Sequence, residues 1–445
     1  MTMLCRWFSV FITLLILAIP LLFSIWIEYV PHHEVIRMDE DLPFDFRVGA
    51  KDNEKINVFN VDISDEQIEE LKTRLSADRL VAALEDCSLC KDRQAFLRNL
   101  SDVMLQFNWK QHQHFLNTFK QYRTEIEGLA IHFVRISLPK EPSKDTVPIL
   151  LLHGFPGSYW DFYKVIPILT NPVRFGFDFG VKRPLLFEVI VPSLPGFGFS
   201  QKHSEADFST LDMARIMAKL MKRLNVHKYF VHGSELLGTE IAAVMSAVHP
   251  SRIRGVHLSN PIVHLQFSPQ VFAKNLLDEF FGIDGDATSS TRKFLESKED
   301  LVPIVDSVGD ALVSSPLGTA SFLMSVWSRF SSRDRSELLN RLFTLDELAT
   351  VSYLYYLTET TPHALRIMHT FFDDDLPTQR LQVRIPCGIL QSPEAPWRNS
   401  RWIARHRFLN VTSFTEASRG GVFLHLQDPN AFAADLFRFV ELVML

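Results

Sequence analysis

Residues 229–240 read YFVHGSELLGTE. Tyr229 to Val231 form a short apolar run that is typical of a buried strand, and the residues from Thr239 onward have the apolar spacing of a helix. A strand that turns into a helix at a glycine indicates a sheet whose strands alternate with helices. A carboxylate, Glu235, stands at this turn, so the sequence predicts a candidate reactive side chain at the carboxyl end of a strand.

Two further apolar runs end in the same way. VPILLL (Val147–Leu152) is stopped by HGFPGS, and LLFEVIVP (Leu185–Pro192) is stopped by SLPGFGFS. After the second run, LDMARIMAKLMKRL (Leu211–Leu224) has apolar residues at helical spacing. This alternation predicts an α/β fold with a parallel sheet that is covered by helices on both faces. Such sheets bind ligands at the carboxyl ends of their strands, where these glycine- and proline-rich loops lie.

A helical block interrupts this pattern. Residues 262–375 have helical character, most clearly in SRDRSELLNRLFTLDELATVSYLYYL (332–357), and strand-like character returns at VRIPCGILQSPEAP (Val383–Pro396). We interpret the block as a lid over the α/β core. The organisation that we predict is a transmembrane anchor at 1–30, an N-terminal segment at 31–145, the first part of the core at 146–261, a helical lid at 262–375 and the second part of the core at 376–445.

The bulk composition argues against several classes of protein. The chain has 445 residues, 47% of them hydrophobic and 22% charged, and a formal net charge of -6. No dense basic tract occurs, so we expect no nucleic-acid partner. His112 and His114 would diverge on a helix, and Cys87-x-x-Cys90 has no second cysteine pair. We therefore expect no metal site and no cofactor, and we interpret the cysteine spacing as incidental.

The N-terminal segment is strongly apolar. Trp7–Ile27, WFSVFITLLILAIPLLFSIWI, contains no charged residue and is long enough to cross a bilayer as a helix. The alternative is a cleaved signal peptide, whose apolar region is usually shorter and ends in small residues, which this segment lacks. We therefore predict a single-pass membrane anchor, whose orientation is left open because one arginine, Arg6, is weak evidence.

These stretches together resemble the microsomal epoxide hydrolases and their juvenile-hormone relatives. The resemblance covers nearly the whole chain and includes the anchor and the motifs FNVDISDEQIEELKTRL, LLHGFPGSYWDF, VPSLPGFGFS and RGGVFLHLQDP. It implies an α/β-hydrolase fold with a helical lid, an N-terminal epoxide-hydrolase extension and an N-terminal transmembrane helix in the endoplasmic reticulum. The activity that it implies is hydrolysis of lipophilic epoxides to diols, with a lipophilic small molecule as the ligand.

The resemblance also implies a two-step mechanism. A carboxylate attacks the epoxide carbon and forms an ester, and a histidine oriented by an acid then activates water to hydrolyse that ester. Two lid tyrosines donate to the epoxide oxygen, and backbone N–H groups form an oxyanion hole. In this chain Glu235 takes the nucleophile position and Glu394 the acid position, and the oxyanion donors are the N–H groups of Phe155 and Leu236.

The nucleophile turn departs from the family's pattern. Where the family has Gly-Gly-Asp-Trp-Gly, this chain has Gly-Ser-Glu-Leu-Leu, beginning at Gly233. The carboxylate of Glu235 lies one methylene further out than that of Asp, and misplacement of about 1 Å can cost on the order of 100-fold in rate. A leucine in a strained turn also leaves open a shifted register, in which Gly238 takes over one place late.

The base and the lid donors depart from the pattern as well. The base position holds Val422, which cannot accept a proton. His425, three residues later, is a candidate substitute base, although a solvent-exposed or capping role is its more ordinary interpretation. The lid-donor positions fall at Met368 and near Ser297. The lid retains three tyrosines, of which one could approach the site, although we expect the cluster to pack the lid onto the core: Tyr353, Tyr355 and Tyr356.

Two functions stay open at this point. The first is a membrane-anchored protein of epoxide hydrolase descent that has lost, or nearly lost, catalysis. The alternative is an active epoxide or ester hydrolase with a rearranged site that uses Glu235 and His425. We favour the first because nucleophile, base and both proton donors have changed together, and loss of a general base alone typically costs about 10²–10⁴-fold.

Overall fold

The computed structural model describes residues 52–137, 143–179, 184–204, 208–263, 305–334, 336–373 and 378–445. The predicted anchor at Trp7–Ile27 and the predicted lid-donor position near Ser297 lie outside the described residues. Within the described part of the chain, no helix is long and apolar enough to cross a membrane.

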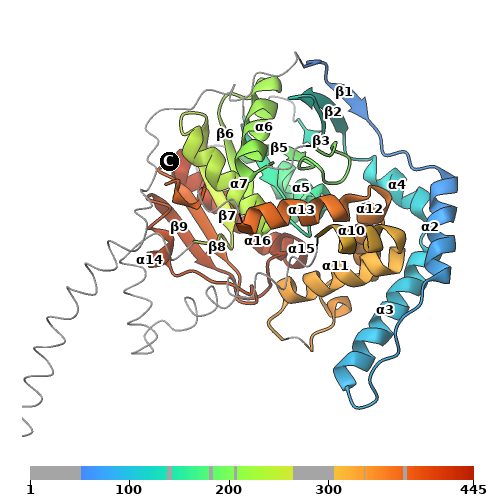
Figure 1. The fold of residues 1–445 in the computed structure, drawn as a ribbon. Helices are drawn as coiled ribbons and strands as arrows, with labels where there is room; N and C mark the ends of the chain where they lie inside the picture. Colours follow the sequence, from blue (N-terminus) through green and yellow to red (C-terminus); the bar gives the residue numbers. More distant parts are fainter. Residues whose placement is uncertain are drawn as a thin grey trace, which may run out of the picture. The chain divides into compact units, whose positions relative to one another are not determined.

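The core is a sheet in which nine strands of the described chain pair in the order β1-β2-β3-β5-β4-β6-β7-β8-β9 (Figure 1). The strands from β5 to β9 in this order pair in parallel, as the sequence predicts. Their bounds are β4 (Asp145–Leu152), β5 (Leu185–Pro192), β6 (Tyr229–Gly233), β7 (Ile253–Ser259), β8 (Cys387–Gln391) and β9 (Val411–Glu416).

One edge of the sheet is antiparallel, which the alternation of strands and helices in the sequence does not predict. The edge consists of β1 (Asn57–Phe59), β2 (Gln121–Ile126) and β3 (Leu129–Ile136), and β3 joins the parallel part through an antiparallel pairing with β5. The physical reason is the tight turn between β2 and β3, where Glu127 and Gly128 both have positive φ, 53° and 77°. Two successive residues with positive φ close an antiparallel hairpin, whereas a parallel pair needs a long crossover.

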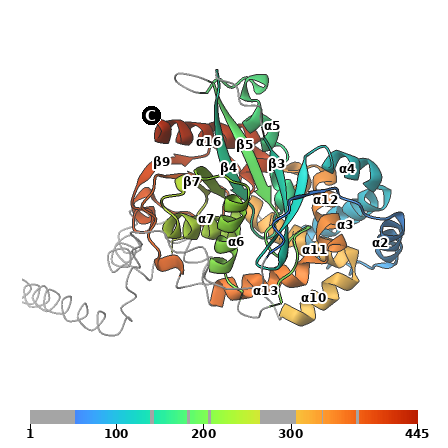
Figure 2. The same cartoon turned by 90° about the horizontal axis from the view of Figure 1, so that it is seen from above.

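Helices cover both faces of the sheet. Figure 2 shows α5 (Val165–Thr170) and α16 (Pro429–Met444) on one side, and α6 (Thr210–Arg223) and α7 (Glu235–Val248) on the other. Because both faces are covered, the parallel strands are largely buried, and every residue of β6 and β8 is buried. The shorter helical elements of the core are η1 (Tyr159–Phe162), η2 (Pro172–Phe175), η6 (Thr378–Arg380), α14 (Arg401–Ala404) and α15 (Leu424–Gln427).

A group of helices follows β7 and precedes β8. It contains α10 (Val305–Ser314), α11 (Pro316–Ser331), η5 (Leu339–Arg341), α12 (Leu345–Leu357) and α13 (Thr360–Asp373). The N-terminal helices pack against this group, with α3 on α12 and α2 on α11. Tyr353 makes one such contact, since its hydroxyl donates to the Met104 carbonyl at 2.7 Å and its ring stacks on Trp109. Tyr353 therefore packs α12 onto the N-terminal helices, which are α2 (Asp65–Ala77), α3 (Ser88–Gln106) and α4 (Trp109–Leu116).

The two cysteines at the start of α3 are bonded to each other. Cys87 and Cys90 form a disulfide, so the interpretation of their spacing as incidental is wrong. The helical turn at the start of α3 brings the two side chains together, because residues three apart lie on the same side of a helix. The disulfide joins the N-cap residue of α3 to the first turn of that helix, where the loop from α2 ends.

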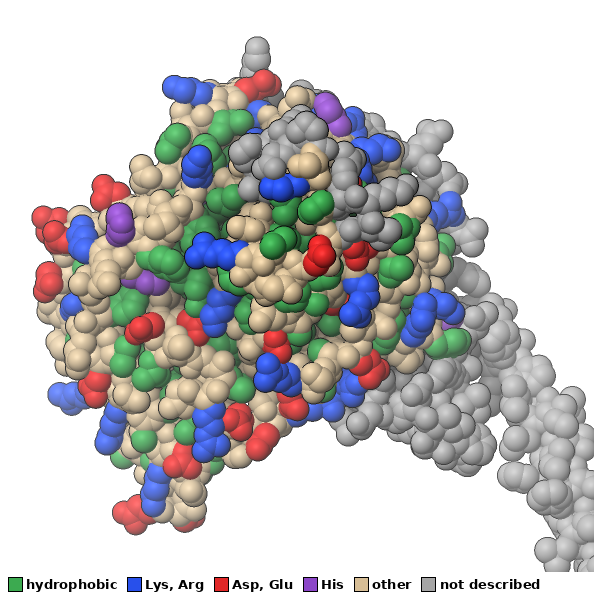
Figure 3. All heavy atoms as spheres, turned by 180° about the vertical axis from the view of Figure 1, so that it is seen from behind, with side chains coloured by type: hydrophobic (Ala, Val, Ile, Leu, Met, Phe, Trp, Pro, Cys, Tyr) green, Lys and Arg blue, Asp and Glu red, His purple; other side chains and the backbone are tan. Residues whose placement is uncertain are grey.

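Charged side chains are mixed on the surface. On the face shown in Figure 3, the described Lys and Arg side chains alternate with Asp and Glu, and neither sign dominates a large area. Such a mixed face provides no broad field that would attract a polyanion.

Candidate functional site

Glu235 lies at the tip of a sharp turn between β6 and α7. Its φ is 51°, a conformation that is strained for a residue with a side chain and is typical of functional turns. Gly238 lies in the first turn of α7, and a Cβ there would come within 2.6 Å of the backbone oxygens of Leu152 and His153. Gly233 packs closely on Gly238 in turn. The glycines therefore let α7 start directly against β4, and the turn keeps its tip at Glu235, not one place later.

The loop after β4 contacts the Glu235 carboxylate. The Gly154 N–H donates a hydrogen bond to Glu235 Oε2. Within the described residues, neither Phe155 N–H nor Leu236 N–H hydrogen-bonds this carboxylate, although the sequence predicts both as oxyanion donors. The extra methylene of Glu carries the oxygen past those two donors to Gly154, one residue earlier in the HGFP loop.

Two more ionisable side chains surround this carboxylate. His425 Nε2 lies 3.7 Å from Glu235 Oε1. Asp161 completes the cluster. One carboxylate oxygen of Asp161, one of Glu235 and a ring nitrogen of His425 all lie within 4.8 Å of one another. All three side chains are 0% exposed. Two carboxylates and an imidazole are donor types that can bind a metal ion. The same three side chains are also the types that an acid–base site without a metal uses.

His425 is buried, so the interpretation as a solvent-exposed or capping residue is wrong. It lies on α15, a single helical turn that packs against η1 and α16. The His425 ring stacks on Phe162 with ring centroids 4.9 Å apart. The packing of α15 between η1 and α16 directs the His425 side chain toward Glu235.

Sequence reasoning missed Asp161. It lies in η1, where Ser158 and Asp161 form a capping box that fixes the turn after the HGFP loop. The signal was present as a serine followed three residues later by an acid in GSYWD. The capping role is visible in the sequence, but the approach to Glu235 depends on how η1 packs against β6.

Burial sets the protonation states at the site. It raises the pKa of Glu235 to about 8, although the Gly154 N–H opposes the shift. Burial, and then the nearby charge of Glu235, raises the pKa of Asp161 well above its usual value. Burial also lowers the pKa of His425 to about 3. At neutral pH the described site therefore holds a protonated Glu235 carboxyl beside a neutral imidazole.

The predicted acid does not reach the predicted base. Glu394 Oε2 accepts a hydrogen bond from the Arg333 N–H at 3.0 Å, beside α11. Neither ring nitrogen of His425 has a hydrogen-bond partner. Val422 is buried, and its N–H donates to the Phe330 carbonyl at 2.8 Å. The imidazole thus lacks the acceptor that orients a general base.

Two side chains of α12 and α13 bear on the predicted proton donors: Tyr355 lies near the site, and Met368 occupies a position where the family's pattern predicts a donor. Met368 is buried on α13 and has no O–H to donate. The Tyr355 hydroxyl donates to the Gly157 carbonyl at 2.7 Å. A Cβ on Gly157 would lie 2.9 Å from Glu235 Oε2, so this glycine borders the carboxylate. Tyr355 is therefore the lid tyrosine that lies at the edge of the site, but its hydroxyl proton is already donated to Gly157.

Two family models match the chain: "Epoxide hydrolase N terminus" at residues 56–162 and "alpha/beta hydrolase fold" at residues 147–367. Epoxide hydrolase 1 of Sus scrofa is 30% identical over 426 residues, which cover 89% of this chain and 91% of the relative. The chain belongs to the epoxide hydrolase family. Juvenile hormone epoxide hydrolase 1 of Ctenocephalides felis is 27% identical over 88% of each chain. The crystal structure of juvenile hormone epoxide hydrolase from the silkworm Bombyx mori superimposes with a TM-score of 0.81 at 26% identity, and covers 91% of this chain and 99% of that one.

In this epoxide hydrolase family member α11 contacts the loops around the site. Trp327 on α11 donates from Nε1 to the Pro156 carbonyl at 3.1 Å, and its ring stacks on Phe423 at 4.1 Å. Because Glu235 is 0% exposed, no water-sized space touches its side chain. A substrate must therefore displace α11 or its neighbours before it can reach the carboxyl group.

A chain of hydrogen bonds lies behind the family's nucleophile position. His232 Nδ1 lies 2.9 Å from His257 Nδ1, and His257 Nε2 lies 3.0 Å from Asp435 Oδ2. If the Asp435 carboxyl oxygen accepts from His257 Nε2–H, then His257 Nδ1 accepts in turn from His232 Nδ1–H. His232 and His425 share a neighbour, since Phe432 packs edge-on against both rings. Two of the buried imidazoles, His232 and His257, are thus held by hydrogen bonds, whereas His425 is held by aromatic packing.

This contrast predicts opposite effects for one substitution at two histidines. His425→Leu is expected to raise the free energy of unfolding by about 1–3 kcal/mol at pH 7, because it removes a buried polar group that has no partner. His257→Leu is expected to lower it by about 1–3 kcal/mol, because it leaves Asp435 and His232 unpaired. Denaturant unfolding of both variants measures the difference, and equal losses would contradict this account of His425.

Proposed function

We propose that the protein is an epoxide hydrolase family member that keeps the form of the lipophilic-epoxide site but turns over weakly or not at all at neutral pH. The observation that carries the proposal is the state of the acid–base pair. Glu235 is held protonated, and His425 lies 3.7 Å away with both nitrogens unpartnered. The proposal includes a membrane anchor at Trp7–Ile27, in the endoplasmic reticulum, which the apolar character of that segment supports.

The first chemical step needs an ionised carboxylate. A Glu235 oxygen would attack a ring carbon of the epoxide, the carbon–oxygen bond of the ring would break, and the alkoxide would take up a proton. With a pKa of about 8, roughly one Glu235 in ten is ionised at pH 7. The phenol that borders the site, Tyr355, already donates to the Gly157 carbonyl. At pH 7 the nucleophile is therefore mostly protonated, and the phenol that would protonate the alkoxide is already hydrogen-bonded elsewhere.

The second step needs a base. Water must attack the ester carbonyl while a base takes its proton, and the Glu235 carboxylate is then released. A neutral His425 can accept that proton, but neither of its ring nitrogens has a hydrogen-bond partner that would orient it, and Glu394 binds Arg333 N–H instead. Loss of such general-base assistance typically costs about 10²–10⁴-fold.

A second candidate function is slow hydrolysis that uses Glu235 and His425. The observation that favours it is the approach of the two side chains across a long stretch of sequence to 3.7 Å. A small movement would bring them into hydrogen-bonding distance, and catalytic hydrogen bonds often shorten only when substrate binds. This candidate predicts a rate that rises with pH, because the ionised fraction of Glu235 increases as the pH rises through about 8.

The test is incubation of the full chain with a lipophilic diaryl epoxide at pH 7 and pH 9, with Glu235→Ala as the control. We expect no more diol at pH 7 from the wild type than from Glu235→Ala. At pH 9 we expect mass added to the peptide that contains Glu235, because the ester forms faster than it is hydrolysed. Diol formation is followed by chromatography and the adduct by mass spectrometry.

Two results would change the conclusion. Turnover at pH 7 of about 1 s⁻¹ or more, abolished in Glu235→Ala, would overturn the proposal of weak or absent activity. Absence of both adduct and diol at either pH would end the second candidate and leave a ligand-binding or surface role for the scaffold.

A further inference from the structure

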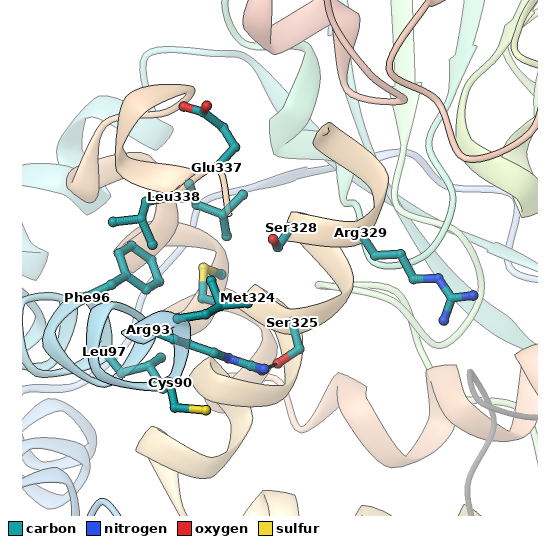
Figure 4. A pocket seen from close by; sticks show the side chains of 12 residues that line it. Cys90, Arg93, Phe96, Leu97, Met324, Ser325, Ser328, Arg329, Glu337 and Leu338 are labelled. Carbon is teal, nitrogen blue, oxygen red and sulfur yellow. Dashed lines mark hydrogen bonds between the residues drawn. The ribbon is translucent and has the colours of Figure 1, made fainter. Parts of the chain in front are cut away.

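An apolar cavity lies outside the acid–base site, between α3 and α11. Its volume is about 340 Å³, which is within the range of small-molecule sites. Figure 4 shows Phe96 and Leu97 from α3 and Met324 from α11 around it, with Leu338 beside η5. The cavity is therefore mainly apolar, its side chains come from the N-terminal segment and from the helices before β8, and its charged lining residues are Arg93, Arg329 and Glu337.

A second cavity of about 470 Å³ adjoins the first. The two cavities share Cys90, Arg93 and Leu97, and the second extends under the loop from α2 to α3. Apolar side chains are unusually exposed here: the exposed fraction is 89% for Val81 and 66% for Leu84. The exposed loop and the two cavities thus form one apolar path that leads to the space between α3 and α11.

A single basic group stands where the two cavities meet. Arg93 reaches from α3 to α11 and donates a hydrogen bond to Ser325 Oγ (Figure 4). No described carboxylate lies within ion-pair distance of its guanidinium. Glu337 lines the first cavity, but it faces Arg341 at 3.9 Å. The guanidinium therefore has donors left for an anion, and its neutral hydroxyl partner does not cancel its charge.

We propose that this cavity binds a single-chain lipophilic carboxylate, with its carboxylate on Arg93 and its alkyl chain between Phe96, Leu97 and Met324. A planar guanidinium binds a carboxylate through two parallel hydrogen bonds, and each buried methylene adds to affinity. A cationic amphiphile would meet the charge of Arg93, and a neutral one would lose the paired hydrogen bonds. The charge of Arg93 favours an anionic amphiphile, and the shape of the cavity favours one with a single alkyl chain.

The proposed site is separate from the acid–base cluster. Met324 and Ser325 face the cavity, whereas Trp327 on the same helix, α11, faces the HGFP loop. The two sites therefore lie on different sides of one helix. The inference goes beyond the proposed function and does not depend on whether Glu235 reacts.

The test is photolabelling of the full chain with dodecanoate that carries a diazirine in its alkyl chain. We expect labelled peptides to contain Phe96 or Met324 after digestion and mass spectrometry. Mapping the label by peptide separates this site from any apolar segment elsewhere in the chain. Excess unlabelled dodecanoate should suppress the label, whereas dodecylammonium should not.

A matched pair of variants tests the role of the charge. Arg93→Met is expected to reduce labelling by about tenfold, because it removes a charge-assisted pair of hydrogen bonds. Arg98→Met makes the same change at an exposed position on α3 that lines neither cavity, and should label as the wild type does. Labelling by a diazirine analogue of dodecanol should be equal in all three proteins.

Several outcomes would overturn the proposal. They are a label that maps outside the two cavities, equal labelling of Arg93→Met and Arg98→Met, and equal competition by dodecanoate and dodecylammonium. The epoxide experiment has a different readout, diol or an adduct at Glu235, so failure of one proposal is distinguishable from failure of the other.

Discussion

Arg407→Met is expected to lower the free energy of unfolding by about 3–5 kcal/mol. Arg407 precedes β9 and makes two hydrogen bonds of 2.6 Å to the two carboxylate oxygens of Glu240 on α7. The side chains are 4% and 3% exposed, so neither charge is solvated by bulk water. The variant would leave the Glu240 carboxylate buried beside the Thr378 hydroxyl, which donates to it at 2.9 Å but carries no charge.

Denaturant unfolding measures this loss, and a surface ion pair provides the control. Arg419 lies 2.7 Å from Asp428, but its side chain is 75% exposed. Arg419→Met is therefore expected to cost less than about 1 kcal/mol. The double variant Arg407→Met with Glu240→Gln should recover part of the loss, because it also removes the buried carboxylate charge that Arg407 neutralises. Similar losses of unfolding free energy in Arg407→Met and Arg419→Met would show that the buried Arg407–Glu240 pair stabilises the fold no more than the exposed Arg419–Asp428 pair.

Glu235→Gln is expected to change the pH dependence of stability by about 5 kcal/mol between pH 4.5 and pH 8. Burial raises the pKa of Glu235 from an ordinary value of 4.5 to about 8 in the folded protein. The folded state therefore keeps a proton that the unfolded state releases above pH 4.5. Stability from this group is complete below pH 4.5, decreases as pH rises, and is lost by about pH 8. Glutamine carries no titrating proton, so the variant should lack this decrease.

The measurement is the free energy of unfolding of both proteins across pH 4–9. On the acid side both should lose stability below about pH 6.5, because burial lowers the pKa of His132 and His425 to about 3 and that of His153 to about 4. The difference between the two curves isolates Glu235. Asp161 is coupled to it through charge, so the double variant with Asp161→Asn should flatten the curve further. Parallel curves for wild type and Glu235→Gln would show that Glu235 is ionised in the folded protein.

Local patterns in the sequence predicted most of the fold. The strand, turn and helix at residues 229–240 are β6, the Glu235 turn and α7, because apolar continuity followed by helical spacing is a local property. The parallel strands at 147–152 and 185–192 were predicted for the same reason. The antiparallel edge was not, because the pairing partner of β3 is set by the hairpin turn at Glu127 and not by the apolar pattern of the strand.

The site was predicted only in part. The sequence places Glu235 at the tip of its turn, and it shows that Val422 and Met368 cannot take the roles of a base and a phenol. It could not show that His425 turns inward on α15, or that Asp161 borders the nucleophile position while it keeps its capping role. These contacts join residues that are far apart in the chain, and they follow from packing of α15 and η1.

By itself, then, the sequence determined the α/β architecture, the epoxide hydrolase descent and the loss of the family's side chains at named positions. Those are properties of residue identity and short-range spacing, which a linear chain displays directly. Only the tertiary structure decided that Glu394 binds Arg333 N–H, that neither ring nitrogen of His425 has a hydrogen-bond partner, and that burial raises the pKa of Glu235 to about 8. The reason is that a pKa and a hydrogen bond depend on the burial and the neighbours that long-range packing creates.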